Sequence, residues 1–240
     1  MIIRPLASGS SGNSYYISDN KTSLLLDAGI PYRQLQIKTG FGLCELSGVL
    51  ISHEHRDHCK AVPELTKRGI DVYALPSVFE SFGVSGHRCH EINVLKSRVT
   101  DSYMPVKVGT FAVTPFNCQH DVPNIGYYIH SKHTGENLLY FTESYYLRFT
   151  FPALHYIMAE ANYSSEAINT NIRSGRVPYE TKKRVVSSHM SIDNLIEMLK
   201  ANDLSQIKQI YLLHLSDNNS NENEFKERVQ REVGCEVYVC

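Results

Sequence analysis

A short run of metal-binding side chains constrains this chain more than any other part of its sequence. Residues 53–58 read His-Glu-His-Arg-Asp-His and follow an apolar run. Imidazole and carboxylate are suitable ligands for divalent zinc, manganese or iron. Side chains two residues apart leave a strand on the same side, so His53 and His55 should face one ion, while Asp57 and His58 on the following turn can face a second. A polar loop that is merely rich in histidine rarely gathers four such ligands. We therefore expect a metal site at the end of a strand.

The length and charge of the chain set broad limits on its organisation. Its 240 residues can bury a full core and show no linker, so we expect one domain over residues 1–240. The 24 Lys and Arg residues nearly balance the 25 Asp and Glu residues, so net charge does not mark a dedicated nucleic-acid binder. A nucleic-acid substrate stays open, because a site with two divalent cations supplies positive charge of its own.

The ends and the hydropathy of the chain bear on its compartment. Met1 to Leu6 lack the basic segment and apolar core of a signal peptide, and no stretch of about 18 apolar residues occurs. We expect a cytoplasmic protein that does not contact a membrane. The oligomeric state stays open, with a homodimer among the arrangements that the sequence allows.

The six cysteines form no C-x-x-C pair, which in a reducing compartment indicates free thiols. Cys59 and Cys118 lie beside candidate ligands, but we expect them to pack as small apolar residues. The segment His87 to His90 lacks a second ligand pair at zinc-site spacing, so we expect a loop there.

The apolar pattern predicts strands and helices in the first half of the chain. Four β-rich runs are expected to form one sheet: Ile2 to Ala7, Ser14 to Ser18, Ser23 to Asp27 and Val49 to Ser52. Short helices are expected over Pro31 to Lys38 and Ala61 to Arg68, and a strand over Asp71 to Leu75. The β-rich middle predicts a second, antiparallel sheet, with strands over Pro105 to Val108, Phe111 to Phe116, Gly126 to His130 and Asn137 to Phe141.

The last third alternates between strands and helices. Strands are expected over His155 to Ala159 and Gln209 to Leu213, and helices over Ser165 to Ile172, Ile192 to Lys200 and Glu222 to Val233. A basic stretch surrounds Pro178, for which a solvated loop is the ordinary interpretation and a phosphate track the more specific one: Arg148, Arg173, Arg176, Lys182, Lys183 and Arg184. Two β-rich halves with helices outside them predict an α/β fold, a four-layer αβ/βα sandwich.

The metal motif, placed after Leu24-Leu25-Leu26-Asp27-Ala28-Gly29, resembles the metallo-β-lactamase superfamily. The likeness implies the αβ/βα sandwich of that superfamily. More narrowly, segments from almost end to end are similar to its YycJ (WalJ) branch of proposed DNA-processing hydrolases: Leu6 to Ser14, Gln119 to Asp121, Gly126 to Tyr128 and His214 to Asn219. The chain is also similar to tRNase Z-type phosphodiesterases.

The resemblance implies two divalent metal ions, zinc or manganese, with iron as an alternative. One ion would be held by His53, His55 and His120, and the other by Asp57, His58 and His214. Glu143 would bridge both ions, although the superfamily usually has Thr-Asp-Thr where this chain has Thr142-Glu143-Ser144. Glutamate is one methylene longer than aspartate, which leaves the metal–metal spacing and the occupancy of the second position open.

Further roles follow from the same likeness. In tRNase Z-type enzymes a glutamate and a histidine form a proton-transfer pair, which implies Glu160 and His189 here, with His189 as the general acid. Alternatives are a helix-capping role for His189 and a simple ion pair for Glu160. Asp57 can act as ligand or as base, and Asp27 is expected to orient a histidine ligand.

The loop Ser8 to Ser14 can offer backbone N–H groups to a phosphate or form a flexible turn. As candidate substrate-binding residues we take Ser10, Ser11, Asn13 and Asn218. The sequence thus predicts a metal-dependent phosphodiesterase or nuclease that acts on DNA or RNA through a metal-bridging hydroxide. Two alternatives stay open: a hydrolase of a small ester, thioester or cyclic nucleotide, and a binding module with a damaged metal site.

Overall fold

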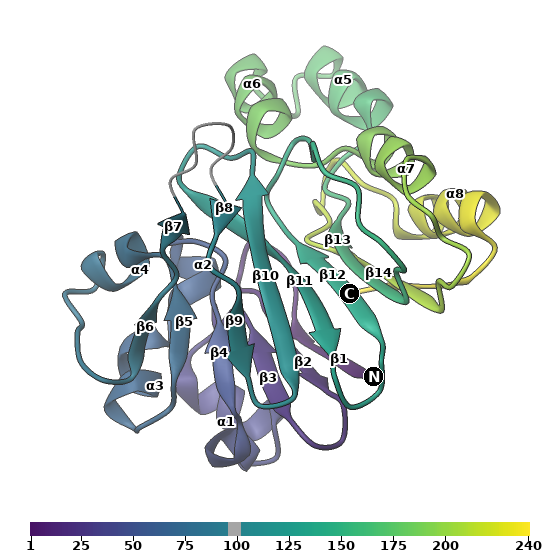
Figure 1. The fold of residues 1–240 in the computed structure, drawn as a ribbon. Coiled ribbons are helices and arrows are strands. Elements are labelled where there is room, and N and C mark those ends of the chain that lie inside the picture. The colour runs from purple at the N-terminus through teal and green to yellow at the C-terminus, as the bar shows by residue number, and fades with distance from the viewer. Residues whose placement is uncertain (96–101) are drawn as a thin grey trace. The chain divides into compact units, whose positions relative to one another are not determined.

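A computed structural model of the chain describes residues 1–95 and 102–240 (Figure 1). The described chain divides into two compact units. Unit 1 contains residues 1–117 and 129–136, and unit 2 contains residues 118–128 and 137–240. Within the described ranges, none of the helices combines the length and apolar character that crossing a membrane would require.

A six-stranded sheet in unit 1 has the order β1-β2-β3-β4-β5-β6. Its strands are β1 (Ile2–Ala7), β2 (Ser14–Ser18), β3 (Ser23–Leu26), β4 (Gly48–Leu50), β5 (Val72–Ala74) and β6 (Cys89–Glu91). The β1/β2 and β2/β3 pairs are antiparallel, whereas β3 to β6 pair in parallel. The prediction that the first strands form one sheet is confirmed.

Short helices cover this sheet and close its core. They are α1 (Tyr32–Lys38), the 3-10 helix η1 (Gly42–Glu45), α2 (Arg56–Cys59), α3 (Val62–Lys67) and α4 (Pro76–Glu80). Val49 and Val72 of the strands pack in one buried cluster with Leu35, Leu65 and Phe79 of the helices. Burying such side chains contributes about 1.5–3 kcal/mol each, so this cluster fixes the strand ends from which the motif projects.

A second sheet has seven strands in the order β15-β14-β13-β12-β11-β10-β9. They are β9 (Val106–Val108), β10 (Phe111–Cys118), β11 (Asn124–Ser131), β12 (Asn137–Phe141), β13 (Tyr156–Glu160), β14 (Gln209–Leu213) and β15 (Glu236–Val239). A two-stranded sheet pairs β7 (Val94–Leu95) with β8 (Ser102–Tyr103).

The second sheet also contains strands beyond the four that the sequence assigned to an antiparallel sheet. Strands β12, β13, β14 and β15 pair in parallel. Parallel neighbours require a long crossover, and residues 142–155 and 161–208 supply two of them. Residues 137–141 form a strand, as predicted, and this strand lies between β11 and the parallel strand β13.

Four helices belong to unit 2: α5 (Ser165–Arg173), α6 (Tyr179–Ser188), α7 (Ile192–Lys200) and α8 (Glu222–Val233). The predicted helices at α5, α7 and α8 are confirmed. The loop expected around Pro178 was wrong, because Pro178 caps α6 and Val185 of this helix packs against Tyr163 and Ile168. Proline suits a helix start, where no intrahelical N–H donor is required.

Several element boundaries in unit 1 also differ from the predictions. Strand β3 ends at Leu26, because Asp27 has a left-handed backbone with φ of 57°. The turn expected after His55 is the short helix α2, and the loop expected over residues 87–90 ends in strand β6, which pairs with β5. Local pattern did not predict β6, since this three-residue strand is defined by its pairing with β5.

Candidate metal centre

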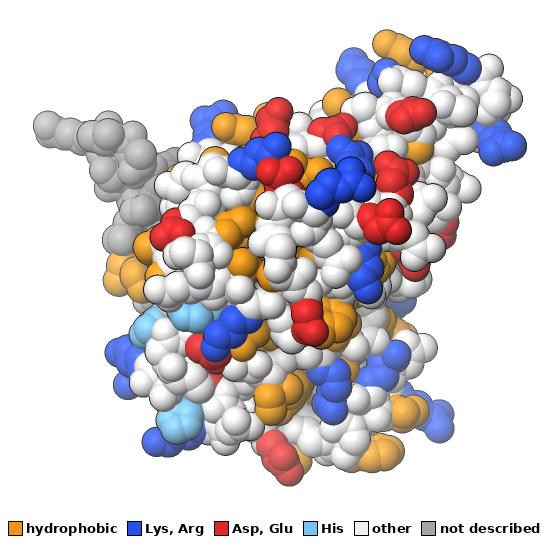
Figure 2. Space-filling view, turned by 90° about the vertical axis from the view of Figure 1, so that its right-hand side faces the viewer, with side chains coloured by type: hydrophobic (Ala, Val, Ile, Leu, Met, Phe, Trp, Pro, Cys, Tyr) orange, Lys and Arg blue, Asp and Glu red, His pale blue; other side chains and the backbone are white. Residues whose placement is uncertain are grey.

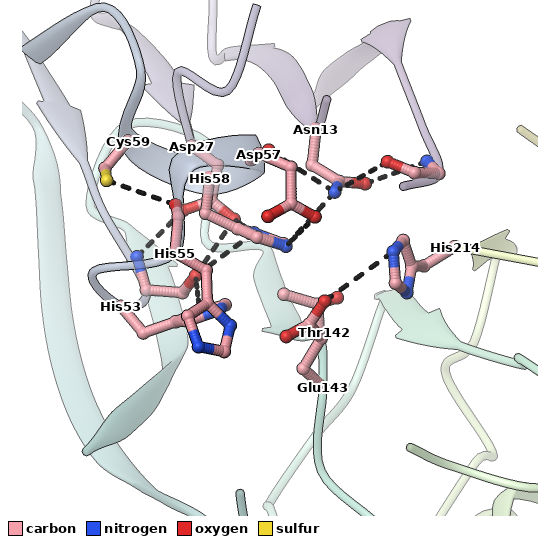
Figure 3. Close-up of polar contacts among 12 residues, drawn as sticks. Asn13, Asp27, His53, His55, Asp57, His58, Cys59, Thr142, Glu143 and His214 are labelled. Atoms are coloured by element: carbon pink, nitrogen blue, oxygen red, sulfur yellow. Dashed lines mark hydrogen bonds and ion pairs between the residues drawn. The ribbon is translucent and has the colours of Figure 1, made fainter. Parts of the chain in front are cut away.

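Unit 1 gathers the three imidazoles of the motif beyond the end of β4 (Figure 3). His55 caps α2 with an extended backbone, and His58 lies inside that helix. The ring of His53 lies 4.7 Å from the ring of His55 and 4.3 Å from that of His58. His53 and His58 are fully buried, while Asp57 is partly exposed and its Oδ2 lies 3.5 Å from His58 Nε2.

A buried carboxylate orients two of these imidazoles. Asp27 Oδ2 accepts hydrogen bonds from His58 Nδ1 at 2.7 Å and from the Ser52 hydroxyl at 3.0 Å. Ser52 Oγ in turn lies 3.0 Å from His53 Nδ1 and can accept a hydrogen bond from it. This network favours imidazoles that carry hydrogen on Nδ1 and a lone pair on Nε2, the form in which histidine binds metal. Asp27 thus makes the contact that an orienting residue requires.

The side chain of Asn13 braces the loop before β2 and contacts the motif. Its Nδ2 lies 3.1 Å from His58 Nε2 and donates to Gly9 O at 3.0 Å, while its Oδ1 accepts from the Tyr15 hydroxyl. Donation to His58 Nε2 is consistent with a lone pair on that nitrogen. Asn13 is buried by these contacts, whereas the neighbouring side chains of Ser10 and Ser11 are exposed.

The backbone next to the motif is closely packed. Asn13 N donates to Asp57 O at 2.7 Å, Ala28 N donates to His58 O at 2.7 Å, and Gly29 N donates to Asn13 O at 2.8 Å. A Cβ atom on Gly29 would overlap the carbonyl of Asp57. Only glycine therefore fits where this backbone approaches the metal-binding segment.

Unit 2 brings together three of the other predicted ligands, His120, Glu143 and His214. Glu143 Oε2 lies 2.8 Å from His120 Nε2, and Glu143 Oε1 lies 3.6 Å from His214 Nε2. His120 follows β10, Glu143 follows β12 and His214 follows β14. The exposed Asp121 also places its Oδ1 2.9 Å from His120 Nε2. The Glu143 carboxylate thus lies close to Nε2 of both imidazoles.

The hydrogen bonds of these imidazoles test whether a cation fits. His120 Nδ1 lies 3.2 Å from the carbonyl of Ser188, and His214 Nδ1 lies 2.8 Å from Glu160 Oε1. Because both partners only accept, each Nδ1 carries hydrogen. In the neutral ring, Nε2 then points a lone pair toward the Glu143 carboxylate. Facing lone pairs of nitrogen and carboxylate oxygen suit a divalent cation, so the donor set fits a metal.

Glu160 connects the unit 2 ligands to His189. Its Oε1 accepts from His189 Nδ1 at 2.7 Å as well as from His214, and its Oε2 accepts from the backbone of Met190 at 3.0 Å. Burial raises the pKa of Glu160, but the charge and hydrogen bond of His189 with the bond from His214 outweigh it and lower that pKa to about 2. Burial lowers the pKa of His189, yet the opposing effect of Glu160 leaves it raised.

Three candidate residues have a left-handed backbone, which sequence reasoning missed. Asp27, Glu143 and His214 have φ of 57°, 52° and 53°, and they are half of the six such non-glycine residues in the described ranges. Strained backbone of this kind collects at functional sites. Two asparagines hold it in unit 2, since Asn124 donates to the carbonyl of Glu143 and Asn162 to that of His214, both at 2.8 Å. Each asparagine lies at or beyond a strand end, where it resembles an ordinary turn residue.

The remaining predicted site residues lie outside these clusters. Asn218 is exposed and lines a cavity of about 390 Å³ near the first turns of α5 and α8. Cys59 and Cys118 are buried, and burial raises the pKa of both thiols, that of Cys59 to about 12. Their burial agrees with the prediction that they pack as small apolar residues.

Sequence comparison shows which known proteins this chain is similar to. Residues 7–122 match the family model of the Metallo-beta-lactamase superfamily. An exodeoxyribonuclease WalJ of Streptococcus pneumoniae is 27% identical over 225 residues, covering 90% of this chain and 81% of the relative. An exodeoxyribonuclease YycJ of Bacillus anthracis is 27% identical over 234 residues, covering 90% of this chain and 83% of the relative.

Solved structures share the fold at low sequence identity. The metallo-beta-lactamase fold protein YhfI from Bacillus subtilis matches with a TM-score of 0.73 and 16% identity, covering 99% of this chain and 95% of that one. The short form of human tRNase Z matches with a TM-score of 0.65 and 14% identity, covering 100% and 96%. The predicted α/β sandwich of this fold is therefore confirmed.

Proposed function

We propose that this chain, whose residues 7–122 match the metallo-β-lactamase family model, is a metal-dependent phosphodiesterase that cleaves DNA, with exonuclease action as in its named relatives. The observation that carries the proposal is the position of the Glu143 carboxylate, which addresses Nε2 of both His120 and His214. A module that only binds nucleic acid has no use for such an arrangement of lone pairs. Both named relatives are exodeoxyribonucleases, which favours DNA over RNA as the substrate.

We propose seven metal ligands, four in unit 1 and three in unit 2: His53, His55, Asp57, His58, His120, Glu143 and His214. Imidazole with carboxylate suits zinc, manganese or iron. Two divalent ions would supply Lewis-acid stabilisation of the charge that develops on a phosphodiester and would lower the pKa of an attacking water. The chain works in this proposal as one metallo-β-lactamase-like domain over residues 1–240.

The chain's own acid and base groups complete the proposed reaction. His189 donates a proton from Nε2 to the leaving oxygen, because Glu160 holds the ring through Nδ1 at 2.7 Å. The ionised Glu160 favours the protonated form of His189 that this step uses. Asp57 serves as a ligand and can orient the attacking water. Ser10, Ser11, Asn13 and Asn218 are the proposed substrate-binding residues.

We also propose the cytoplasm as the compartment of this protein. All six cysteines are unpaired thiols. Free cysteines are usual where glutathione and thioredoxin keep thiols reduced. Recovery of the native protein in the cytoplasmic fraction of its source cells would test this assignment.

The first experiment measures metal content. Purified protein, stripped with chelator and reconstituted with zinc, manganese or iron, should bind divalent metal in a fixed ratio by mass spectrometry. Failure to bind any of the three after reconstitution would contradict every hydrolase function considered for this chain.

The second experiment identifies the substrate class. The metal-loaded protein is offered single-stranded DNA, duplex DNA, RNA, a chromogenic phosphodiester, cyclic nucleotides and a thioester. We expect hydrolysis of the chromogenic diester and release of mononucleotides from DNA ends. Activity on the thioester or on cyclic nucleotides alone would replace the nuclease by a hydrolase of small substrates.

A further inference from the structure

The helix pair α5–α6 carries a concentration of positive charge that the proposed metal site does not use. Residues 165–188 contain five basic side chains and two acidic ones, whereas the whole chain has 24 basic and 25 acidic residues. The basic ones, here called the basic arm, are Arg173, Arg176, Lys182, Lys183 and Arg184. Blue side chains gather on this helical lobe at the top of Figure 2.

The two helices have an inner and an outer face. Ile168 and Val185 pack with Tyr163 in a small buried cluster that holds the helices together. On α6, Val185 and Ser188 are buried, whereas Lys183 is exposed and the ring of Tyr179 is 68% exposed. Residues four apart lie on one helix face, so Tyr179 and Lys183 form an aromatic and basic pair that faces solvent.

Most of the basic arm is exposed to solvent. Arg173, Arg176 and Lys183 are all exposed, and Lys182 is the basic residue that is partly buried and donates to Asn169 at 2.6 Å. A local excess of exposed positive charge attracts an anionic partner.

The basic arm leads directly into the proposed catalytic machinery of unit 2. Helix α6 ends at Ser188, whose carbonyl accepts from His120 Nδ1, and His189 follows as its C-terminal cap. At 1.5 Å per residue, Lys183 lies about 8 Å of helix before Ser188. A polyanion that is bound along α6 would therefore run toward His189.

We propose that the outer face of α5–α6 binds the phosphate backbone of single-stranded DNA, with Tyr179 stacking on a base. This inference rests on the proposed nuclease function and adds where the strand is held beyond the reacting phosphate. Positively charged side chains with an exposed aromatic ring are the usual means of binding single strands without sequence preference.

The test measures binding of a 20-nucleotide single-stranded DNA with phosphorothioate linkages, which resists cleavage, to the metal-loaded protein by fluorescence anisotropy across a salt series. The variant Arg173→Gln/Arg176→Gln/Lys183→Gln removes three exposed charges. We expect about ten-fold weaker binding and a salt slope smaller by about two, because each phosphate contact on a single strand contributes about 0.7 to that slope.

A matched control removes the same number of exposed charges elsewhere on unit 2, in the variant Lys200→Gln/Lys226→Gln/Arg231→Gln of α7 and α8. DNA affinity should fall far less in this control than in the arm variant. Equal loss in both variants, or an unchanged salt slope in the arm variant, would overturn the proposal. Binding of RNA or anionic lipid vesicles that exceeds binding of DNA would assign the arm to another partner and overturn it too.

The aromatic part of the proposal has its own test. Tyr179→Ala should weaken DNA binding about five-fold or more, while Tyr179→Phe should retain affinity because the ring can still stack. Equal affinities for the two variants would remove Tyr179 from the binding face. Hydrolysis of the chromogenic diester by the unaltered protein reports on the proposed function alone, so failure of that function and failure of the arm are distinguishable.

Discussion

At the scale of single residues, Glu143 decides whether the chain can hold metal as its relatives' pattern implies. Its carboxylate lies 2.8 Å from His120 Nε2 and 3.6 Å from His214 Nε2. The left-handed backbone at Glu143, with φ of 52°, sets where the longer side chain begins. The extra methylene relative to aspartate is thus combined with an unusual backbone conformation, and the carboxylate still addresses both imidazoles.

The role of Glu143 can be measured with two substitutions. Glu143→Gln should lower metal content and reduce diester hydrolysis at least 100-fold, because an amide supplies one neutral oxygen where the carboxylate supplies two charged ones. Glu143→Asp keeps the charge and should retain more metal than the glutamine variant. Metal content by mass spectrometry would count against the ligand role if both variants matched the unaltered protein.

Substitutions of His189 and Glu160 should differ in their effects on metal binding and on turnover. His189→Ala should leave metal bound and lower kcat about 100-fold, as expected when a general acid is lost. Loss of metal from this variant would show that His189 is a ligand instead. The hydrogen bond from His189 Nδ1 to Glu160 Oε1, at 2.7 Å, explains the orientation of the His189 ring without a metal.

Glu160→Gln should affect both properties, because Glu160 Oε1 accepts from the Nδ1 atoms of His189 and His214. Substituting a residue that orients a metal ligand typically weakens metal binding about 10–100-fold. We therefore expect a higher metal dissociation constant together with a lower kcat. A fall in kcat with unchanged metal affinity would mean that Glu160 acts only through His189.

At the scale of elements, the packing of Gly29 against α2 positions the metal motif. A Cβ at Gly29 would meet the carbonyl of Asp57, whereas a Cβ at Gly42 would meet only the end of the Glu45 side chain, at 3.7 Å. Gly29→Ala should destabilise the protein by about 1–3 kcal/mol through overpacking, and Gly42→Ala should stay within about 0.5 kcal/mol. Urea unfolding of both variants provides the comparison, and equal midpoints would show that the motif segment shifts freely.

Sequence pattern predicted those elements whose apolar period is local. Residues 192–200 repeat apolar side chains at helical spacing, and α7 has the bounds that this pattern predicts. Helix α6 was missed because its basic residues conceal the inward position of Val185. The sequence did not predict that β13 and β14 join the second sheet beside β12, because pairing partners are not encoded in a single strand.

At the scale of the whole molecule, the proposed ligands divide into those that the sequence reveals directly and those that it does not. His53 to His58 are adjacent, so their chemistry is visible as a motif. His120, Glu143 and His214 lie far apart in the chain and were found through resemblance to a known family. Ser52, Asn124 and Asn162 contact the proposed ligands or their backbone, and they carry no signal beyond that of ordinary polar residues near strand ends.

The carboxylate of Asp19 makes contacts that bear on the stability of the chain in acid. Its carboxylate accepts from the hydroxyls of Thr110 and Ser131, both at 2.6 Å, and from the backbone N–H of Thr22 at 2.8 Å. One side chain therefore joins three segments of unit 1 that are distant in sequence. Burial raises the pKa of Asp19, but the hydrogen bonds from Ser131 and Thr110 outweigh it and lower that pKa to about 2.

A carboxylate whose pKa is depressed in the folded state stabilises that state above its unfolded pKa, and this contribution is lost as pH falls toward the folded value. Asp19→Asn removes the charge and should cost about 1–2 kcal/mol at pH 7. The free energies of unfolding of the two proteins, measured by urea denaturation of metal-free samples, should therefore converge between about pH 4 and pH 2. Metal-free samples exclude the separate loss of stability that follows when acid protonates histidine ligands. A constant difference across that range would mean that the Asp19 carboxyl contributes through shape and not through charge.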